Sequence, residues 1–506
     1  MEEEELLEGM EIQIPPPPIE DPWYSRPIDV HRWSDHPEVK GLVDSIWTTH
    51  FSDMDRAASA PGPRPKATFK SQLKVLILDL YVAWLEDPAL SIGVAMSMNY
   101  WDTTSRYNAL KISKRIIRIV KRLQEVGLID LARGSYGGPY ATTNRTGRIR
   151  ASKELQGQFM VLKVVRDDIY RIEAEECIVL KDGVAFGDGT KLYDYQDTAD
   201  TNRMRGELQA YNRVLANSFI DLPSLEEAAV GRADPYGRVF KQALDHNHHF
   251  VRRIFSRGSW ELNGRFYGAW WQLVSSAVRK DIYINDTPTV EVDFKGLHVS
   301  ILSAEQGVVV EGDPYTLEGL ALPGVPAALL RSLVKQLVLT ALNAKDKKSA
   351  FQSFRDGWPA NHYGKGMTNE ELTFLLEAFT AQHPHLSKLV CADQGIRLMN
   401  VDARIAEMVH RHFTDQGVPV LSVHDSFIID YTRVAELKRV MAAASAAVAG
   451  RPLAVSAAAL GVDEMAPEDR LDFIAWTQAP RCSAYLGRMR AWEARVGREV
   501  IPYRIG

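Results

Sequence analysis

The segment Pro419–Asp430, PVLSVHDSFIID, is the most informative stretch of the chain. It is an apolar run that only Ser422, His424, Asp425 and Ser426 interrupt. Such a run predicts a buried strand or hairpin, here with a single acidic residue in its middle. A buried aspartate is costly unless it has a partner or a cation, so Asp425 is a candidate metal ligand. Backbone amides in a turn would satisfy the same side chain, and this alternative stays open.

A second carboxylate of this kind stands earlier in the chain. Thr289–Phe294, TVEVDF, alternates apolar and polar residues as a strand does and brings Asp293 to the strand end. A helix over Leu297–Gln306, closed by Gly307, is expected to follow. A carboxylate at a strand end beside a turn can be reached by a metal, so Asp293 is a second candidate ligand. The simpler interpretation is an aspartate whose side chain is satisfied by backbone amides in the turn. The His-Asp-Ser run after Val423 is not a hydrolytic triad, because adjacent residues in extended chain point to opposite faces.

Between the two aspartates, the segment Val325–Asn343, VPAALLRSLVKQLVLTALN, predicts a long helix. Arg331 and Lys335 are four residues apart and therefore share a face of this helix. Two cations on one face suit a triphosphate, because they offer fixed positive charge to its oxygens throughout a transfer. The alternative is an ordinary surface helix, which the many leucines and valines disfavour.

The N-terminal half contains a basic helix. A core helix is expected to begin at Phe69, and a second over about Ser113–Val126 has one apolar face and is closed by Gly127. Two strands and a hairpin tip at Gly134–Pro139 follow. Helix, basic helix and hairpin is an order that resembles a winged helix-turn-helix module, in which the basic helix enters the major groove. The alternatives are a solvated surface helix or a protein-contact module. The residues expected to contact nucleic acid are Lys114, Arg115, Arg118, Arg122, Arg145 and Arg148.

The remainder of the chain is less informative. Residues 1–68, acidic and then rich in proline, are expected to be a mobile tail and a linker. Within residues 156–260 the run Arg203–Asn217 and the segment Val251–Arg257 are helix-like. The net charge of -5 gives no global argument for nucleic acid. Three widely spaced cysteines fit a reducing compartment, and no apolar run reaches a membrane span, so we expect a cytoplasmic protein without a membrane partner.

Taken together, the three segments around Asp293, Lys335 and Asp425 resemble motifs A, B and C of family A DNA polymerases and single-subunit phage-type RNA polymerases. Arg331–Thr340, RSLVKQLVLT, is similar to motif B of the phage-type enzymes, and the VHDSF that contains Asp425 is similar to their motif C. Asp313-Pro-Tyr and an upstream Gly-Arg ending at Arg265 resemble elements that flank motif A. The resemblance covers about residues 263–430.

Two positions depart from the pattern of these families. Asn343 stands where motif B usually ends in a tyrosine, and His298 stands at the position of the family A steric-gate glutamate. Both positions bear on how the sugar is recognised. The preference for ribonucleotides or deoxyribonucleotides therefore does not follow from the resemblance.

The resemblance implies an α+β fold, with a right-hand polymerase palm and reduced helical fingers over 261–506 and a thumb-like or connecting region over 156–260. A winged helix over 69–155 would precede them. It implies that Asp293 and Asp425 hold two divalent cations, Mg²⁺ or Mn²⁺, and that Lys335 is catalytic. The residues implied to bind nucleoside triphosphate and the template-primer are Arg331, Asn343, His298, Arg265 and His424.

The implied function is template-dependent nucleotidyl transfer by a small DNA or RNA polymerase or primase of phage or mobile-element type. The alternative is a DNA-binding replication initiator or regulator whose palm has lost catalysis. Both aspartates and Lys335 favour the enzyme, whereas Asn343 and the short fingers favour the binder.

Overall fold

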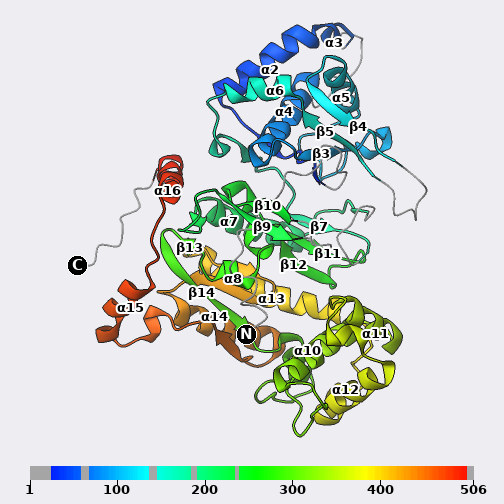
Figure 1. Ribbon diagram of the computed structural model, residues 1–506, viewed down its shortest axis with the longest axis vertical. Helices are drawn as coiled ribbons and strands as arrows, with labels where there is room; N and C mark the ends of the chain where they lie inside the picture. The colour runs from blue at the N-terminus through cyan, green and yellow to red at the C-terminus, as the bar shows by residue number, and fades with distance from the viewer. Residues whose placement is uncertain (1–23, 58–67, 136–144, 184–190, 234–238, 498–506) are drawn as a thin grey trace. The chain divides into compact units, whose positions relative to one another are not determined.

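The computed structural model describes residues 24–57, 68–135, 145–183, 191–233 and 239–497, and its fold is of the predicted α+β class (Figure 1). Two compact units make up the chain. Unit 1 comprises Met1–Glu176, Leu225–His249 and Cys482–Val500, and unit 2 comprises Cys177–Ser224, Phe250–Arg481 and Ile501–Gly506. This division is coarser than the four segments expected from the sequence, and each unit is built from stretches far apart in the chain.

Unit 1 contains a four-stranded sheet in the order β1-β3-β5-β4, in which β5 pairs antiparallel with both β3 and β4. Two smaller sheets pair β2 with β6 and β9 with β10. The elements of this unit are β1 (Ser25–Pro27), β2 (Arg32–Trp33), α2 (Pro37–His50), α3 (Ser52–Ala57), α4 (Phe69–Glu86), β3 (Ser91–Val94), η1 (Met98–Tyr100), α5 (Arg115–Glu125), β4 (Ile129–Ala132), β5 (Gly147–Ala151), α6 (Lys153–Met160), η2 (Arg166–Asp168), β6 (Tyr170–Arg171), β9 (Ala229–Ala233), β10 (Val239–Ala243), η3 (His246–His248) and α16 (Ser483–Val496).

The helices α4 and α5 form the centre of unit 1, as their apolar periodicity predicts. Thr68 caps α4 by accepting a hydrogen bond from the Ser71 N–H at 3.0 Å. The side chains of α5 that lie in the core include Ile116, Ile119, Val120 and Leu123, which form the apolar face expected of this helix. The strands on either side of the predicted hairpin tip are β4 and β5, while residues 136–144, with most of that tip, lie outside the described residues.

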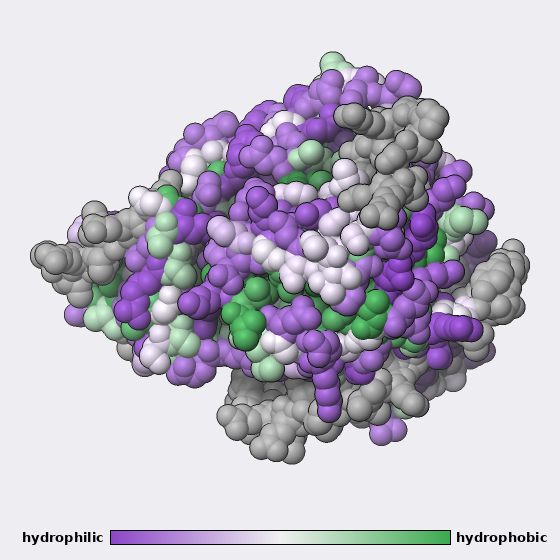
Figure 2. Space-filling model, turned by 90° about the horizontal axis from the view of Figure 1, so that it is seen from above, coloured by the Kyte–Doolittle hydropathy of each residue, from purple (hydrophilic) through white to green (hydrophobic). Residues whose placement is uncertain are grey.

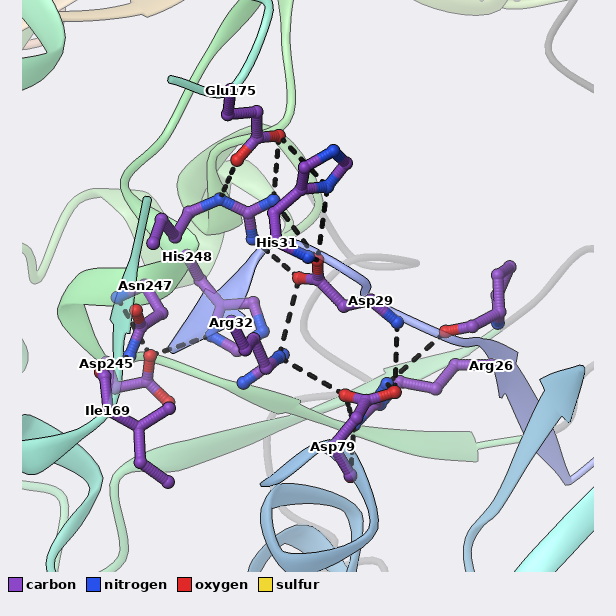
Figure 3. A network of polar contacts seen from close by, with 12 residues as sticks. Arg26, Asp29, His31, Arg32, Asp79, Ile169, Glu175, Asp245, Asn247 and His248 are labelled. Atoms are coloured by element: carbon purple, nitrogen blue, oxygen red, sulfur yellow. Dashed lines mark hydrogen bonds and ion pairs between the residues drawn. The ribbon is translucent and has the colours of Figure 1, made fainter. Parts of the chain in front are cut away.

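A buried ionic network fastens the first described residues to α4 (Figure 3). Asp79 on α4 is fully buried, and it accepts hydrogen bonds from Arg26 Nη1 at 3.0 Å and from the Asp29 N–H at 2.9 Å. Arg32 lies 3.2 Å from the same carboxylate, and Arg171 of β6 donates to Asp29 at 2.6 Å. A buried carboxylate needs such partners, so this network fixes the path of the chain through β1 and β2.

The described residues 24–57 differ from the expectation of a tail and linker over 1–68. They form two strands and two helices, and Val39, Val43, Ile46, Trp47 and Phe51 are part of the core of unit 1. The average composition of residues 1–68 is dominated by the glutamates and prolines at its ends, which hides the amphipathic α2 in between. The expected tail Met1–Pro22 and nearly all of the expected linker lie outside the described residues.

Unit 2 is built around a six-stranded sheet in the order β15-β16-β14-β13-β8, with β17 also paired to β14. A second sheet has the order β12-β11-β7. Its elements are β7 (Ile178–Leu180), α7 (Ala199–Ala216), β8 (Ile220–Asp221), β11 (Arg252–Phe255), β12 (Asn263–Tyr267), η4 (Trp270–Gln272), α8 (Ser276–Arg279), β13 (Tyr283–Ile284), β14 (Thr287–Phe294), α9 (Leu297–Glu305), α10 (Ala327–Asn343), α11 (Lys347–Asp356), η5 (Tyr363–Gly366), α12 (Asn369–Gln382), η6 (Pro384–Leu386), α13 (Gly395–Thr414), β15 (Leu421–Val423), β16 (Ser426–Asp430), α14 (Val434–Ala449), β17 (Val455–Ala457), η7 (Val462–Glu464), η8 (Pro467–Asp469) and α15 (Arg470–Thr477).

The helices of unit 2 fall into two groups. α14 packs on β14, and α13 packs on β12, α9 and α14, so both helices cover the strands. α10 contacts α11 and α12, and these three lie side by side as a separate helical group (Figure 1). The predicted helices over 297–306, 325–343 and 203–217 are confirmed as α9, α10 and α7.

The expectation of a helix over Val251–Arg257 is wrong, because these residues form β11. Arg253 and Phe255 of β11 are paired in parallel with β7 and antiparallel with β12, and most of the strand is buried. Pairing on both sides is a long-range interaction that overrides a weak local preference.

Hydrophobic residues on the face shown in Figure 2 are in small patches separated by hydrophilic ones, which is the usual pattern of a protein surface. Among the described residues, no helix has the length and apolar character needed to cross a membrane.

Candidate active site

The register of three strands brings the two predicted carboxylates together. β15 and β16 form a hairpin in which Val423 pairs with Ser426, so His424 and Asp425 are its two loop residues. β16 pairs antiparallel with β14 in the register that sets Asp293 opposite Ser426. Asp293 therefore lies beside the loop that carries Asp425, although 132 positions separate them in the sequence. The Phe294 N–H points to the Asp425 carbonyl at 3.4 Å.

The pKa of Asp293 shows that several negative charges lie close together at this site. Its side chain is accessible through a cavity, but protein surrounds most of it, and this desolvation raises its pKa to about 7. The carboxylates of Asp425 and Glu291 raise the pKa further, whereas Lys335 lowers it. Asp293 and Asp425 thus repel one another in the absence of a counter-charge.

Helix α10 supplies the cationic wall of the site. Lys335 and Arg331 are both exposed and lie one turn apart, as predicted. Arg331 forms an ion pair with Asp313, the acidic residue of the Asp-Pro-Tyr element. Asn343, at the last turn, donates from Nδ2 to the Leu339 carbonyl at 2.7 Å. Its amide fills the space beside Gly395, where a Cβ would lie 1.8 Å from Asn343 Oδ1, so a larger residue at 395 would displace the Asn343 side chain.

All eight residues predicted for catalysis and substrate binding line one cavity of about 610 Å³ in unit 2. The strand side contributes Asp293, and α10 contributes its cations and Asn343. Tyr315, Met399 and Leu339 add apolar surface. The residues predicted from the sequence that line it are Arg265, Asp293, His298, Arg331, Lys335, Asn343, His424 and Asp425. The structure brings these side chains together, and their roles are proposals treated below.

One wall of the cavity rests on Asp402, a residue of α13 that is fully buried. Arg265 donates from Nε to both carboxylate oxygens of Asp402 at 3.0 Å, and His298 Nε2 lies 3.0 Å from one of them. Burial alone would raise the pKa of Asp402, but Arg265 and His298 outweigh it and hold that pKa below its usual value. Asp402 is thus an ionised anchor for two residues that face the cavity.

His424 is held in an uncommon conformation at the tip of the hairpin. Its φ of 59° lies in the left-handed region, which few residues other than glycine adopt. Burial lowers the pKa of His424, and the positive charge of Arg265 lowers it further. Its Nδ1 is buried without a hydrogen-bond partner in the described part of the chain, and its ring packs edge-on to Tyr267 at 5.5 Å. His424 is therefore neutral at pH 7.

Sequence reasoning missed two residues of this region. Asp402 gives no local signal, because it is one polar residue in an amphipathic helix. Glu291 lies two residues before Asp293 on the same face of β14, and it accepts hydrogen bonds from Arg279 and Ser426. The alternation in TVEVDF already placed Glu291 and Asp293 on one face, and this pattern could have identified it.

The side chains at the centre of the cavity fit a divalent cation of the Mg²⁺ or Mn²⁺ type. Within the described ranges, no three His, Cys, Asp or Glu side chains are grouped as a metal site. Two neighbouring carboxylates, whose charge Lys335 offsets only in part, nevertheless offer the hard oxygen ligands that these ions prefer. The raised pKa of Asp293 is the observation that supports this fit, since a cation would relieve the same repulsion.

The basic residues predicted to contact nucleic acid lie on α5 and near the β4–β5 connection. Lys114, Arg118 and Arg145 are exposed, and Arg115 is partly exposed. The guanidinium groups of Arg115 and Arg118 lie 4.9 and 5.2 Å from the ring of Phe69.

Two further residues of this set are less accessible. Arg122 is bound to Asp53 at 2.6 Å, which compensates its charge and makes it a weaker candidate for a phosphate contact. Arg148 is half-buried on β5.

No protein-family model matches the sequence, and no curated protein matches it. Among solved structures, the chain is similar to the POL domain of Pol1 from M. smegmatis in complex with DNA primer-template and dNTP. The identity is 12%, the TM-score is 0.27, and the match covers 51% of this chain and 51% of that one, so the chain spans about half of that structure's length. A TM-score this low does not establish a common fold, and the function is therefore inferred from the chain's own residues.

Replacement of Asp402 by asparagine tests the anchor in the cavity wall. Asp402→Asn removes the charge that Arg265 and His298 share, and breaking a buried pair from one side should cost about 3 kcal/mol of stability. Urea unfolding would measure the loss. Asp415→Asn, an exposed change just after the same helix, is the matched control and should fall within about 0.5 kcal/mol of wild type. Equal unfolding midpoints for both variants would contradict the anchor role.

Proposed function

We propose that the cavity of unit 2 is the active site of a template-dependent nucleotidyltransferase, a small DNA- or RNA-polymerising enzyme of phage or mobile-element type. The observation that supports it is the meeting of Asp293, Asp425 and Lys335, from three separate segments, in one accessible cavity. Paired carboxylates facing a lysine are the minimal set for two-metal phosphoryl transfer. In this proposal the six-stranded sheet is the palm, and α10, α11 and α12 are reduced fingers.

Asp293 and Asp425 are the residues that would hold two divalent cations, Mg²⁺ or Mn²⁺. Bound there, such cations supply Lewis acidity that activates an attacking 3′-hydroxyl and stabilises a pyrophosphate leaving group. The protein's own part is to fix Asp293 near the end of β14, beside the loop that carries Asp425, before any ligand arrives. Little reorganisation is then required during the reaction.

Lys335 and Arg331 would bind the triphosphate from the α10 side. Lys335 lines the same cavity as Asp293 and lowers the pKa of that carboxyl, so its ammonium would offset the charge of phosphate oxygens bound there. Arg331 is bound to Asp313, and a triphosphate would compete with this half-exposed carboxylate for the guanidinium. Asp313 would thus hold Arg331 in the cavity until substrate binds.

The remaining residues of the wall would position the nucleotide and the primer-template. Arg265 and His298 are held together by Asp402, and the Asn343 amide is hydrogen-bonded to the Leu339 carbonyl. His424, neutral and next to Asp425, would place its ring against the reacting end. Preorganised side chains of this kind reduce the entropic cost of bringing two substrates together.

Unit 1 would supply a second nucleic-acid contact through a winged helix over 69–155. The order α4, β3, α5, β4, β5 and the antiparallel strand order β3-β5-β4 support this assignment. The helix α5 would be the recognition helix, since its outward face carries Lys114, Arg115 and Arg118.

The metal-ligand assignment predicts that Asp293→Asn and Asp425→Asn each abolish nucleotide incorporation. Each change removes a charged ligand without changing the volume, so folding should remain nearly intact. Primer extension with Mg²⁺ and with Mn²⁺ would measure incorporation, and thermal unfolding would verify the fold. Substantial incorporation by either purified variant would contradict the assignment.

The role of Lys335 predicts a loss in chemistry rather than in nucleic-acid affinity. Lys335→Ala should lower the single-turnover rate by about 100- to 1,000-fold, the usual effect of removing one preorganised charge. Lys335→Arg should recover only part of the rate, because it keeps the positive charge but replaces the compact ammonium with a planar guanidinium. Lys348→Ala, an exposed lysine of α11 outside the cavity, is the control. A defect confined to template binding would mean that Lys335 contacts the backbone of the nucleic acid.

The winged-helix assignment predicts a change in salt dependence. Arg115→Ala with Arg118→Ala should weaken DNA binding and lower the slope of log K against log salt by about one for each lost phosphate contact. Lys163→Ala with Arg490→Ala removes the same charge from exposed positions elsewhere in unit 1 and should leave the slope unchanged. Equal slopes for the two double variants, in a fluorescence titration, would favour a protein-contact role for α5.

A further inference from the structure

The loop that carries Asp425 is short and conformationally demanding. Only His424 and Asp425 separate the paired residues Val423 and Ser426, and His424 has a φ of 59°. A non-glycine residue in this region is strained and persists only where its surroundings fix it. Some contact at the base of the loop must therefore hold it in place.

Ser426 provides that contact. Its hydroxyl donates a hydrogen bond to Glu291 Oε1 at 2.5 Å and lies 3.3 Å from the Val423 carbonyl across the loop base. Ser426 directly follows Asp425 and stands opposite Asp293 in the sheet. The hydroxyl thus connects the strand that carries one carboxylate to the loop that carries the other.

Glu291 is itself held by Arg279, at the end of α8. Arg279 donates from Nε and from Nη2 to the two carboxylate oxygens of Glu291, both at 3.0 Å. Its Nη1 donates to the Val274 carbonyl at 3.1 Å, so the guanidinium is fixed as well. The side chains of Arg279 and Glu291 are 16% and 19% exposed, which limits screening of this pair by water.

We propose that Glu291 is a positioning residue, which holds the Asp425 loop through Ser426 and thereby sets the affinity of the Asp293–Asp425 pair for divalent cations. The proposal rests on the function proposed above. Glu291 acts on the site through a hydrogen bond to the base of the loop and is not itself a ligand. Its charge is taken up by Arg279, which leaves the carboxylates of Asp293 and Asp425 as the free oxygen donors.

Binding of Mn²⁺ to the full-length chain, measured by isothermal titration calorimetry, tests this role directly. Ser426→Ala removes the hydroxyl and keeps both aspartates. It should weaken Mn²⁺ binding about 10-fold, the low end of the losses seen when a contact outside the metal ligands is removed, because the hydroxyl holds the loop base and does not touch a ligand. Glu291→Gln should act in the same direction. The double variant should bind Mn²⁺ no more weakly than the single variant with the lower affinity, because both substitutions break the same hydrogen bond.

Ser422→Ala is the matched control on the same hairpin. Ser422 is buried on β15 and does not line the cavity, so loss of its hydroxyl should leave Mn²⁺ affinity unchanged. In primer extension, Ser426→Ala should raise the Mg²⁺ concentration for half-maximal rate about 10-fold with little change in the rate at saturating Mg²⁺. A general loss of structure would lower the saturating rate instead, and urea unfolding would detect it.

The outcomes separate the two proposals. Wild-type Mn²⁺ affinity in Ser426→Ala would overturn the positioning role. Weaker Mn²⁺ binding in Glu291→Gln but not in Ser426→Ala would also overturn it, because Glu291 would then be a direct metal ligand. A wild-type chain that fails to bind Mn²⁺ would overturn it as well. A chain that binds Mn²⁺ but incorporates no nucleotide would contradict the proposed function, while the comparison of Ser426→Ala with Ser422→Ala would still test the role of Glu291.

Discussion

The candidate site depends on one constraint, the antiparallel register between β14 and β16. Because Asp293 stands opposite Ser426, the two-residue loop before Ser426 places Asp425 next to Asp293. A shift of one residue would turn every side chain of β16 to the other face of the sheet. Such a shift would exchange the buried Phe427 and Ile428 between the two faces of the sheet and disturb the packing on both. The hydrophobic pattern of the sheet thereby fixes a polar site at its edge.

The other walls of the cavity are held by two ion pairs, a buried one at Asp402 and a half-exposed one at Arg331. Asp402 fixes Arg265 and His298 from the strand side, and on the α10 side Arg331 is paired with Asp313. Lys335 is left facing the two carboxylates. A site arranged in this way presents opposite charges at fixed positions, which suits transfer of a highly charged group and requires little movement during the reaction.

The sequence was sufficient to predict site residues that lie within a recognisable local pattern of apolar and polar residues. The alternation around Asp293, the apolar run around Asp425 and the helical spacing of Arg331 and Lys335 each have a short-range signal, and the cavity contains all of them. Asp402 and Ser426 have no such signal, because their partners Arg265 and Glu291 lie more than a hundred positions away. The same reason explains the errors in secondary structure. β11 is a strand because of its neighbours in space, and the elements between residues 24 and 57 are folded because Asp79 and the core of unit 1 hold them.

The most direct test of the central claim is templated incorporation by the wild-type chain. The protein would be given a primed template of defined sequence and one nucleotide at a time, as dNTP or rNTP, with Mg²⁺ and with Mn²⁺. The account predicts extension only with the nucleotide complementary to the templating base, dependent on the divalent cation, and it leaves the choice of sugar to the measurement. Binding of the primer-template without extension under any of these conditions would contradict it and would favour a DNA-binding initiator or regulator with an inactive palm.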